Sequence, residues 1–64
     1  MINLSANLKK IRNRREVSQM TVAKKLGVTR QAVSQWEHNI TYPDIENLVK
    51  LSQIFHCDIN ELLF

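Results

Sequence analysis

The sequence is poor in the residues that form disulfides, sharp bends and membrane spans. It holds one cysteine, one glycine and one proline in 64 residues. The lone Cys57 excludes an internal disulfide, which is typical of a reducing compartment. No apolar run approaches the roughly 20 residues that cross a bilayer, and the opening MINLSANLKK lacks the apolar core of a signal peptide. We therefore expect a cytoplasmic protein with no membrane partner.

The sequence also lacks glycine-rich and proline-rich stretches, which argues against a linker or a disordered tail. Hydrophobic residues make up 44% of the chain, enough for a compact core. A chain of this length buries only about 60% of the surface that its unfolded form exposes, and it has no room for a second core. The sequence therefore predicts a single folded domain over residues 1–64.

Acidic residues are scarce in the first half of the chain. Residues 1–30 carry eight lysines and arginines against the single acid Glu16, and residues 31–64 carry one lysine against five acids, so the halves have net charges of +7 and −4. A basic half favours a polyanionic partner, because lysines and arginines near phosphates release condensed counterions. The alternative is a solvated charged surface without a partner.

Apolar residues recur at helical spacing, and no segment shows the alternation or the hairpin turn of β-strands. N-cap residues precede four of the helical segments, at Ser18, Thr29, Asp44 and Asp58, and DINE at 58–61 has the spacing of a capping box. We predict an all-α fold with helices at about 4–15, 18–26, 29–38, 45–55 and 58–63 and a loop at 39–43. The expected inward stripes are Leu4, Leu8 and Ile11; Val22, Ala23 and Leu26; Ala32, Val33 and Trp36; and Ile45, Leu48, Val49, Ser52 and Phe55.

The one glycine, Gly27, stands between the second and third predicted helices. A connection this short requires a residue at positive φ, which glycine adopts at little steric cost. On a wheel of about 100° per residue, the apolar side chains of the third helix gather on one side and the polar ones on the other. The polar face consists of Arg30, Gln31, Ser34, Gln35 and His38. Such a bare face, dense in hydrogen-bonding groups, is typical of a helix that reads bases in the major groove.

The segment QMTVAKKLGVTRQAVSQW, residues 19–36, resembles the helix-turn-helix of the Cro and C1 repressor family of prokaryotic and phage regulators. YPDIENLVKLSQIF and DINELL resemble that family's fourth and fifth helices. The resemblance implies a compact five-helix, lambda-repressor-like domain that binds a pseudo-palindromic operator, usually as a dimer. Glu16 and Asn39 stand at positions where the family often has glycine. Because glutamate adopts the left-handed conformation less readily than asparagine, the connection between the first two helices, which contains Glu16, is the least typical part.

The resemblance and the residue chemistry together suggest the contacts to DNA. We expect Gln31 and Gln35 to pair with adenine edges, Arg30 to reach guanine or a phosphate, and Ser34 to be a weaker reader of bases. The residues expected at phosphates are Gln19, Lys24, Thr29, Asn39 and Thr41. For Asn39 and Thr41 the alternative is an ordinary capping loop.

The resemblance also implies structural roles, and the lack of known motifs argues against a metal site or an active site. The family pairs the positions of Arg12 and Glu37 in a largely buried ion pair, and Trp36 is expected in the core rather than against a base. His38, His56 and Cys57 lack the spacing of metal ligands, so we expect no metal. No nucleophile–base set, phosphate-binding glycine loop or carboxylate pair indicates catalysis, so we expect no enzyme, no cofactor and no small-molecule ligand.

Two functions remain open. The first is a sequence-specific regulator of transcription that binds double-stranded DNA as a homodimer. It is expected to be a repressor, since no segment is left for a sensory or polymerase-contacting domain. The second is a protein-binding module of the same fold, such as an antitoxin-like protein or an anti-regulator. We expect the dimer contact at Ile54, His56 and Phe64, where apolar side chains are not fully used by the core.

Overall fold

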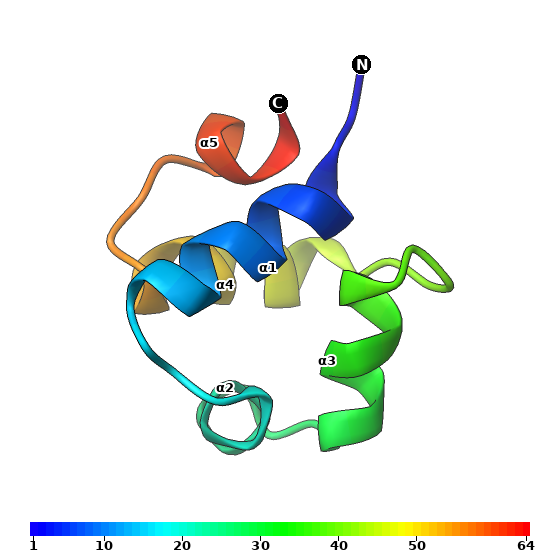
Figure 1. Ribbon diagram of the computed structural model, residues 1–64, viewed down its shortest axis with the longest axis vertical. Helices are drawn as coiled ribbons and strands as arrows, with labels where there is room; N and C mark the ends of the chain where they lie inside the picture. The colour runs from blue at the N-terminus through cyan, green and yellow to red at the C-terminus, as the bar shows by residue number, and fades with distance from the viewer.

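Five helices and no strand make up the computed structural model, which describes residues 1–64 (Figure 1). The helices are α1 (Leu4–Arg14), α2 (Gln19–Leu26), α3 (Arg30–Glu37), α4 (Ile45–Ile54) and α5 (Ile59–Leu63). In Figure 1, α1 crosses the middle of the molecule, α5 lies above it, α2 lies below and α3 stands at the right. The all-α, five-helix prediction is confirmed, and every predicted boundary falls within one residue of the observed one.

The four predicted N-caps are confirmed, because each side chain accepts a hydrogen bond from a backbone amide of the first turn that follows it. The distances are 3.0 Å for Ser18 to the Thr21 amide, 3.1 Å for Thr29 to Ala32, 2.8 Å for Asp44 to Asn47 and 2.9 Å for Asp58 to Asn60. The predicted capping box at 58–61 is wrong. The amide of Glu61 donates to the backbone carbonyl of Asp58 instead of to its side chain, because this short helix begins with a tighter turn.

Four helices end in the same way, on a residue at left-handed φ. These residues are Glu16 (φ 55°), Gly27 (φ 74°), Asn39 (φ 59°) and His56 (φ 51°). The amide of the residue that follows each one bonds to a carbonyl five residues back, which is the pattern of a Schellman motif. These bonds run from Val17 to Arg12 (3.2 Å), Val28 to Ala23 (3.0 Å), Ile40 to Gln35 (2.9 Å) and Cys57 to Ser52 (3.0 Å).

Buried side chains from all five helices meet in one core, whose members are Leu4, Leu8, Val22, Ala23, Leu26, Val33, Trp36, Leu51, Phe55 and Leu62. Trp36 is buried, as predicted. The predicted stripe of α4 is confirmed at Phe55, which is buried, and at Leu48, which packs against the core, but it is wrong at Ile45 and Val49. Ile45 is 80% exposed and Val49 is 36% exposed, whereas Leu51, which was not in the stripe, is fully buried. Apolar residues cover most of the circumference of α4, so their spacing alone does not fix which side faces the core.

The two ends of the chain lie side by side. The amide of Asn3 donates to the Leu63 carbonyl at 2.6 Å. The side-chain amide of Asn7 on α1 donates to the Leu62 carbonyl at 3.0 Å. These bonds hold α5 against α1 on the side of the molecule away from α2 (Figure 1).

Candidate nucleic-acid interface

One side of helix α3 packs into the core, and the other side carries polar side chains. Val33 is fully buried and Trp36 is 5% exposed. Among the polar residues of the helix, Arg30 and Gln31 are exposed, while Ser34 and Gln35 are half-buried. The Thr29 cap and the packing of Val33 and Trp36 therefore fix the helix, and its opposite face is left open to a partner.

The C-terminal end of α3 is tied to the loop that follows it. The Gln35 carbonyl accepts the amides of Ile40 (2.9 Å) and Thr41 (3.5 Å), and the Thr41 hydroxyl lies 3.5 Å from the Gln35 side-chain oxygen. His38 Nδ1 lies 2.7 Å from the Ser34 carbonyl oxygen. The loop thus brings Asn39 and Thr41, both exposed, to the end of α3 that carries Gln35.

The N-terminal end of α3 presents a second group of polar side chains. Thr29 caps the helix, and Arg30 Nη1 donates to the side-chain oxygen of Gln19, the first residue of α2, at 3.1 Å. Candidate phosphate contacts therefore stand at both ends of the polar face. Lys24 is exposed on α2, and no hydrogen bond joins its side chain to the other candidates.

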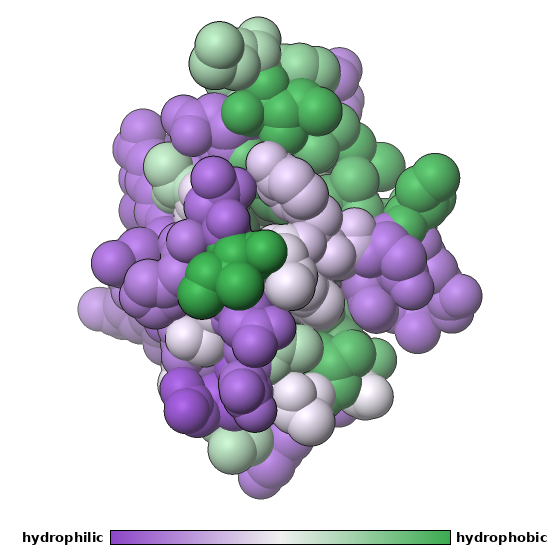
Figure 2. Space-filling view, turned by 90° about the vertical axis from the view of Figure 1, so that its right-hand side faces the viewer, coloured by the Kyte–Doolittle hydropathy of each residue, from purple (hydrophilic) through white to green (hydrophobic).

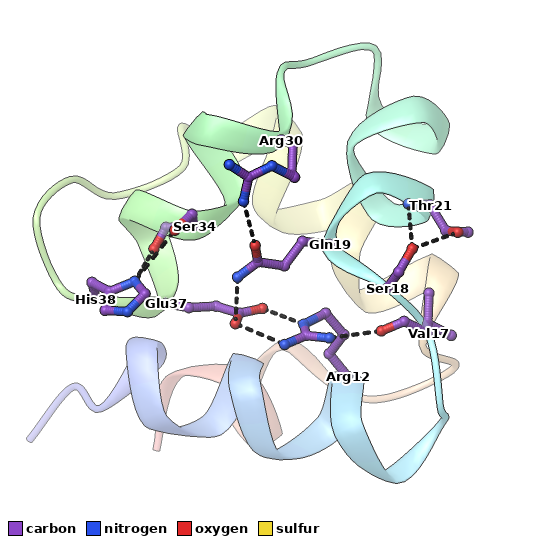
Figure 3. Close-up of polar contacts among 9 residues, drawn as sticks. All are labelled: Arg12, Val17, Ser18, Gln19, Thr21, Arg30, Ser34, Glu37 and His38. Atoms are coloured by element: carbon purple, nitrogen blue, oxygen red, sulfur yellow. Dashed lines mark hydrogen bonds and ion pairs between the residues drawn. The ribbon is translucent and has the colours of Figure 1, made fainter.

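A buried ion pair between Arg12 and Glu37 lies next to Gln19 (Figure 3). Arg12 Nε lies 2.5 Å from Glu37 Oε2, and Arg12 Nη2 lies 3.0 Å from Glu37 Oε1. The Glu37 side chain is 1% exposed and that of Arg12 is 13% exposed. Arg12 Nη1 also donates to the Val17 carbonyl at 2.8 Å, so one guanidinium joins α1, the turn before α2 and the end of α3.

Gln19 connects this ion pair to the polar face of α3. Its Nε2 donates to Glu37 Oε1 at 3.1 Å, while its oxygen accepts from Arg30. The sequence pattern predicts Gln19 only as a phosphate contact, and it gives no signal for either hydrogen bond. Both depend on how α2 and α3 pack, which a one-dimensional pattern does not contain.

The residues expected at a dimer contact differ in exposure. Ile54 is half-buried and packs against the core, His56 is exposed in the turn before α5, and Phe64 is 67% exposed beyond α5. His56 and Phe64 lie at opposite ends of the short α5. Figure 2 shows that the side of the molecule carrying α3 is mixed: hydrophilic groups cover most of its left half, and apolar groups lie at the top, where the chain ends lie in Figure 1, and also at the centre and right.

No three His, Cys, Asp or Glu side chains lie close enough together to hold a metal ion. None of the five helices combines the length and the apolar character needed to cross a membrane. Burial raises the pKa of the Cys57 thiol, and the nearby Glu61 carboxylate adds to that rise.

Comparison with known proteins gives matches along almost the whole chain. A family model described as helix-turn-helix matches residues 8–62. YqaE of Bacillus subtilis, an uncharacterized HTH-type transcriptional regulator, is 37% identical over 59 residues, which are 92% of this chain and 51% of that protein. The HTH-type transcriptional activator BcrR of Enterococcus faecalis is 34% identical over 97% of this chain and 30% of its own length. The chain thus spans about half the length, or less, of these relatives.

A similar solved structure is that of the c2 repressor protein of phage P22 in complex with a synthetic operator. It superimposes with a TM-score of 0.89 at 32% identity, and the match covers 98% of this chain and 96% of that one. All five helices of the present chain therefore have counterparts in a structure that was solved on DNA.

Proposed function

This chain belongs to the helix-turn-helix family of the Cro/C1 type, and we propose that it is a transcriptional regulator that binds specific sequences of double-stranded DNA. The observation that carries the proposal is the exposed polar face of α3 on a helix whose opposite face, Val33 and Trp36, is locked in the core. A rigid helix that carries hydrogen-bonding side chains on its outer side can enter the major groove without losing its own packing.

Base readout is assigned to α3. Gln31 is exposed, and its amide can pair with both N6 and N7 of adenine; Gln35 can do the same one turn further along. Ser34 lies between them and makes a weaker contact. Arg30 at the start of the helix can reach guanine or a phosphate.

Backbone contacts are assigned to both ends of α3. Gln19 and Thr29 stand near its first turn, Asn39 and Thr41 follow its last turn, and Lys24 on α2 adds a positive charge. Contacts to phosphates on either side of a groove fix the register of the helix without reading sequence. The arrangement supports an orientation in which α3 lies in the groove with phosphates at its two ends.

We propose that the regulator acts in the cytoplasm as a homodimer on two half-sites. Two copies would place their α3 helices one DNA turn apart, about 34 Å. The contact is assigned to Ile54, His56 and Phe64, and the exposure of Phe64 supports it. Repression is the simplest outcome, because a bound dimer excludes other proteins from the same stretch of DNA. The structural similarity to the P22 c2 repressor also supports repression.

The test is a titration of a random-sequence duplex at several salt concentrations, followed by selection of bound sequences from a random pool. A DNA-binding protein of this charge should lose affinity steeply as salt rises, because each neutralised phosphate contributes a slope of about −0.9 in log K against log salt. The pool should yield one enriched sequence with two related half-sites. A flat salt response and no enrichment would favour the protein-binding module instead.

A further inference from the structure

The hydrogen bonds around Gln19 fix the direction in which its side-chain amide points. The Glu37 carboxylate accepts from Arg12 at both oxygens and can only accept, so the group that Gln19 turns toward it must be the NH2. The amide oxygen therefore faces the other way. There it accepts the 3.1 Å hydrogen bond from Arg30 Nη1.

This order of groups forms a polarised chain from the core to the surface (Figure 3). The positive Arg12 meets the negative Glu37, the donor end of the amide faces Glu37, and its acceptor end faces the positive Arg30. Each hydrogen bond in such a chain strengthens the next, because the dipoles align. Arg12 already balances the buried Glu37 charge, so the charge of Arg30 remains available at the surface.

Arg30 is held at one edge of the α3 face rather than at its centre. Arg30 and Glu37 are seven residues apart, which places them within about 20° of each other around the helix. Gln31 and Gln35 stand about 100° and 140° further round. The hydrogen bond to Gln19 therefore draws the Arg30 guanidinium toward α2 and away from the side on which the two glutamines project.

We propose that Gln19 is a positioning residue that holds Arg30 for a DNA phosphate, so that base readout falls to Gln31 and Gln35. The proposal rests on the proposed function and narrows it, since Arg30 otherwise has two possible targets. Only one of the five N–H donors of Arg30 is used by Gln19, which leaves the remainder for phosphate oxygens. A guanidinium held in place before binding also loses less side-chain freedom when it binds.

The first part of the test concerns the target of Arg30. Arg30→Ala, Arg30→Lys and the wild-type chain are each used for selection from a random duplex pool and for titration against salt. For a phosphate contact, Arg30→Ala weakens every duplex by about the same factor, lowers the magnitude of the salt slope by about 1 and leaves the selected sequence unchanged. Arg30→Lys keeps most of the affinity and the slope, because a phosphate accepts a point charge.

The opposite result identifies a base contact. Loss of preference at one guanine in both Arg30 variants overturns the proposal, because a lysine does not reproduce the two-pronged fit of arginine to that base. Gln31→Ala is the matched control on the same helix. It changes the selected sequence at one position, which shows that the selection detects the loss of a single base contact.

The second part concerns Gln19. Methionine is similar in length and neither donates to Glu37 nor accepts from Arg30, so Gln19→Met releases the guanidinium while keeping its charge. We expect Gln19→Met to weaken binding several-fold, and Arg30→Ala to cost less in the Gln19→Met background than in the wild type. Fully additive losses would overturn the positioning role. Helical circular dichroism of each variant shows that the fold is retained.

The failure of this proposal differs from a failure of the proposed function. If the wild-type chain binds no duplex, the function itself is wrong. If it selects a DNA sequence but Arg30→Ala changes that sequence, only the assignment of Arg30 is wrong.

Discussion

Single residues at left-handed φ end four of the helices, and only one of them is glycine. Left-handed backbone costs an L-residue about 1–2 kcal/mol, and asparagine and histidine tolerate it better than most. The sequence predicts the conformation at Gly27, and the resemblance marks Glu16 and Asn39 as places where a glycine is usual. His56 gives a weaker signal: histidine tolerates left-handed φ, but the resemblance does not mark this turn.

The first prediction concerns Gly27. Gly27→Ala should destabilise the protein by about 1 kcal/mol, measured as a lower urea midpoint. A Cβ at this position meets no atom within 4 Å, so the whole cost comes from the backbone. Glu16→Gly is the matched control, and it should be neutral or stabilising because it relieves the same strain. An unchanged midpoint in Gly27→Ala would show that the turn adopts another conformation.

The second prediction concerns the ion pair of Arg12 and Glu37. Removing either partner strands a desolvated charge, so Arg12→Ala and Glu37→Ala should each destabilise by about 3–5 kcal/mol in chemical denaturation. The double replacement Arg12→Met with Glu37→Leu should cost much less than the sum, because it leaves no buried charge. Losses under about 1 kcal/mol for both single variants would mean that solvent reaches the pair.

Among the helices, α3 and α4 show when a sequence determines which side is buried. In α3, polar and apolar residues separate cleanly, and the predicted inward residues Val33 and Trp36 are buried. In α4, apolar residues cover most of the circumference, and the structure buries Leu51 rather than Ile45. The caps were predictable because they depend on neighbours in sequence. The contact of Gln19 with Arg30 was not, because it depends on how two helices pack.

The third prediction tests the phase of α4 with a pair of truncations in one helix. Leu51→Ala should destabilise by about 2–5 kcal/mol, because it removes buried methyl groups and leaves a cavity. Ile45→Ala should change stability by no more than about 0.5 kcal/mol, since its side chain is largely in solvent. If the two variants lost equal stability in thermal or urea unfolding, Ile45 would face the core, as the spacing of the apolar residues suggests.

At the scale of the whole molecule, the basic half of the chain forms α1, α2 and the start of α3, and most of the acids lie in and around α4 and α5. Most of the basic residues and most of the acidic residues thus belong to different helices. A polyanion that approaches α2 and α3 meets the positive part of the chain. This polarity along the sequence supports DNA as the partner.

The fourth prediction concerns assembly. Phe64→Glu should abolish cooperative occupancy of a duplex with two half-sites, because like charges would face each other across a two-fold axis. Its affinity for a single half-site should stay close to wild type. Ile45→Glu is the matched variant, since Ile45 is, at 80%, the most exposed large apolar side chain in residues 31–64. Unaltered cooperativity in Phe64→Glu together with its loss in Ile45→Glu would move the interface to α4.

The central claim is that the outer face of α3 reads DNA sequence, and the most direct test is selection from a random duplex pool with Gln35→Ala beside Lys24→Ala. Gln35→Ala should relax the preference at one base position and cost about 1–3 kcal/mol on the wild-type site. Lys24→Ala should weaken all duplexes about equally and leave the preference intact. If Gln35→Ala selects the wild-type sequence with wild-type affinity, α3 is not the reading helix.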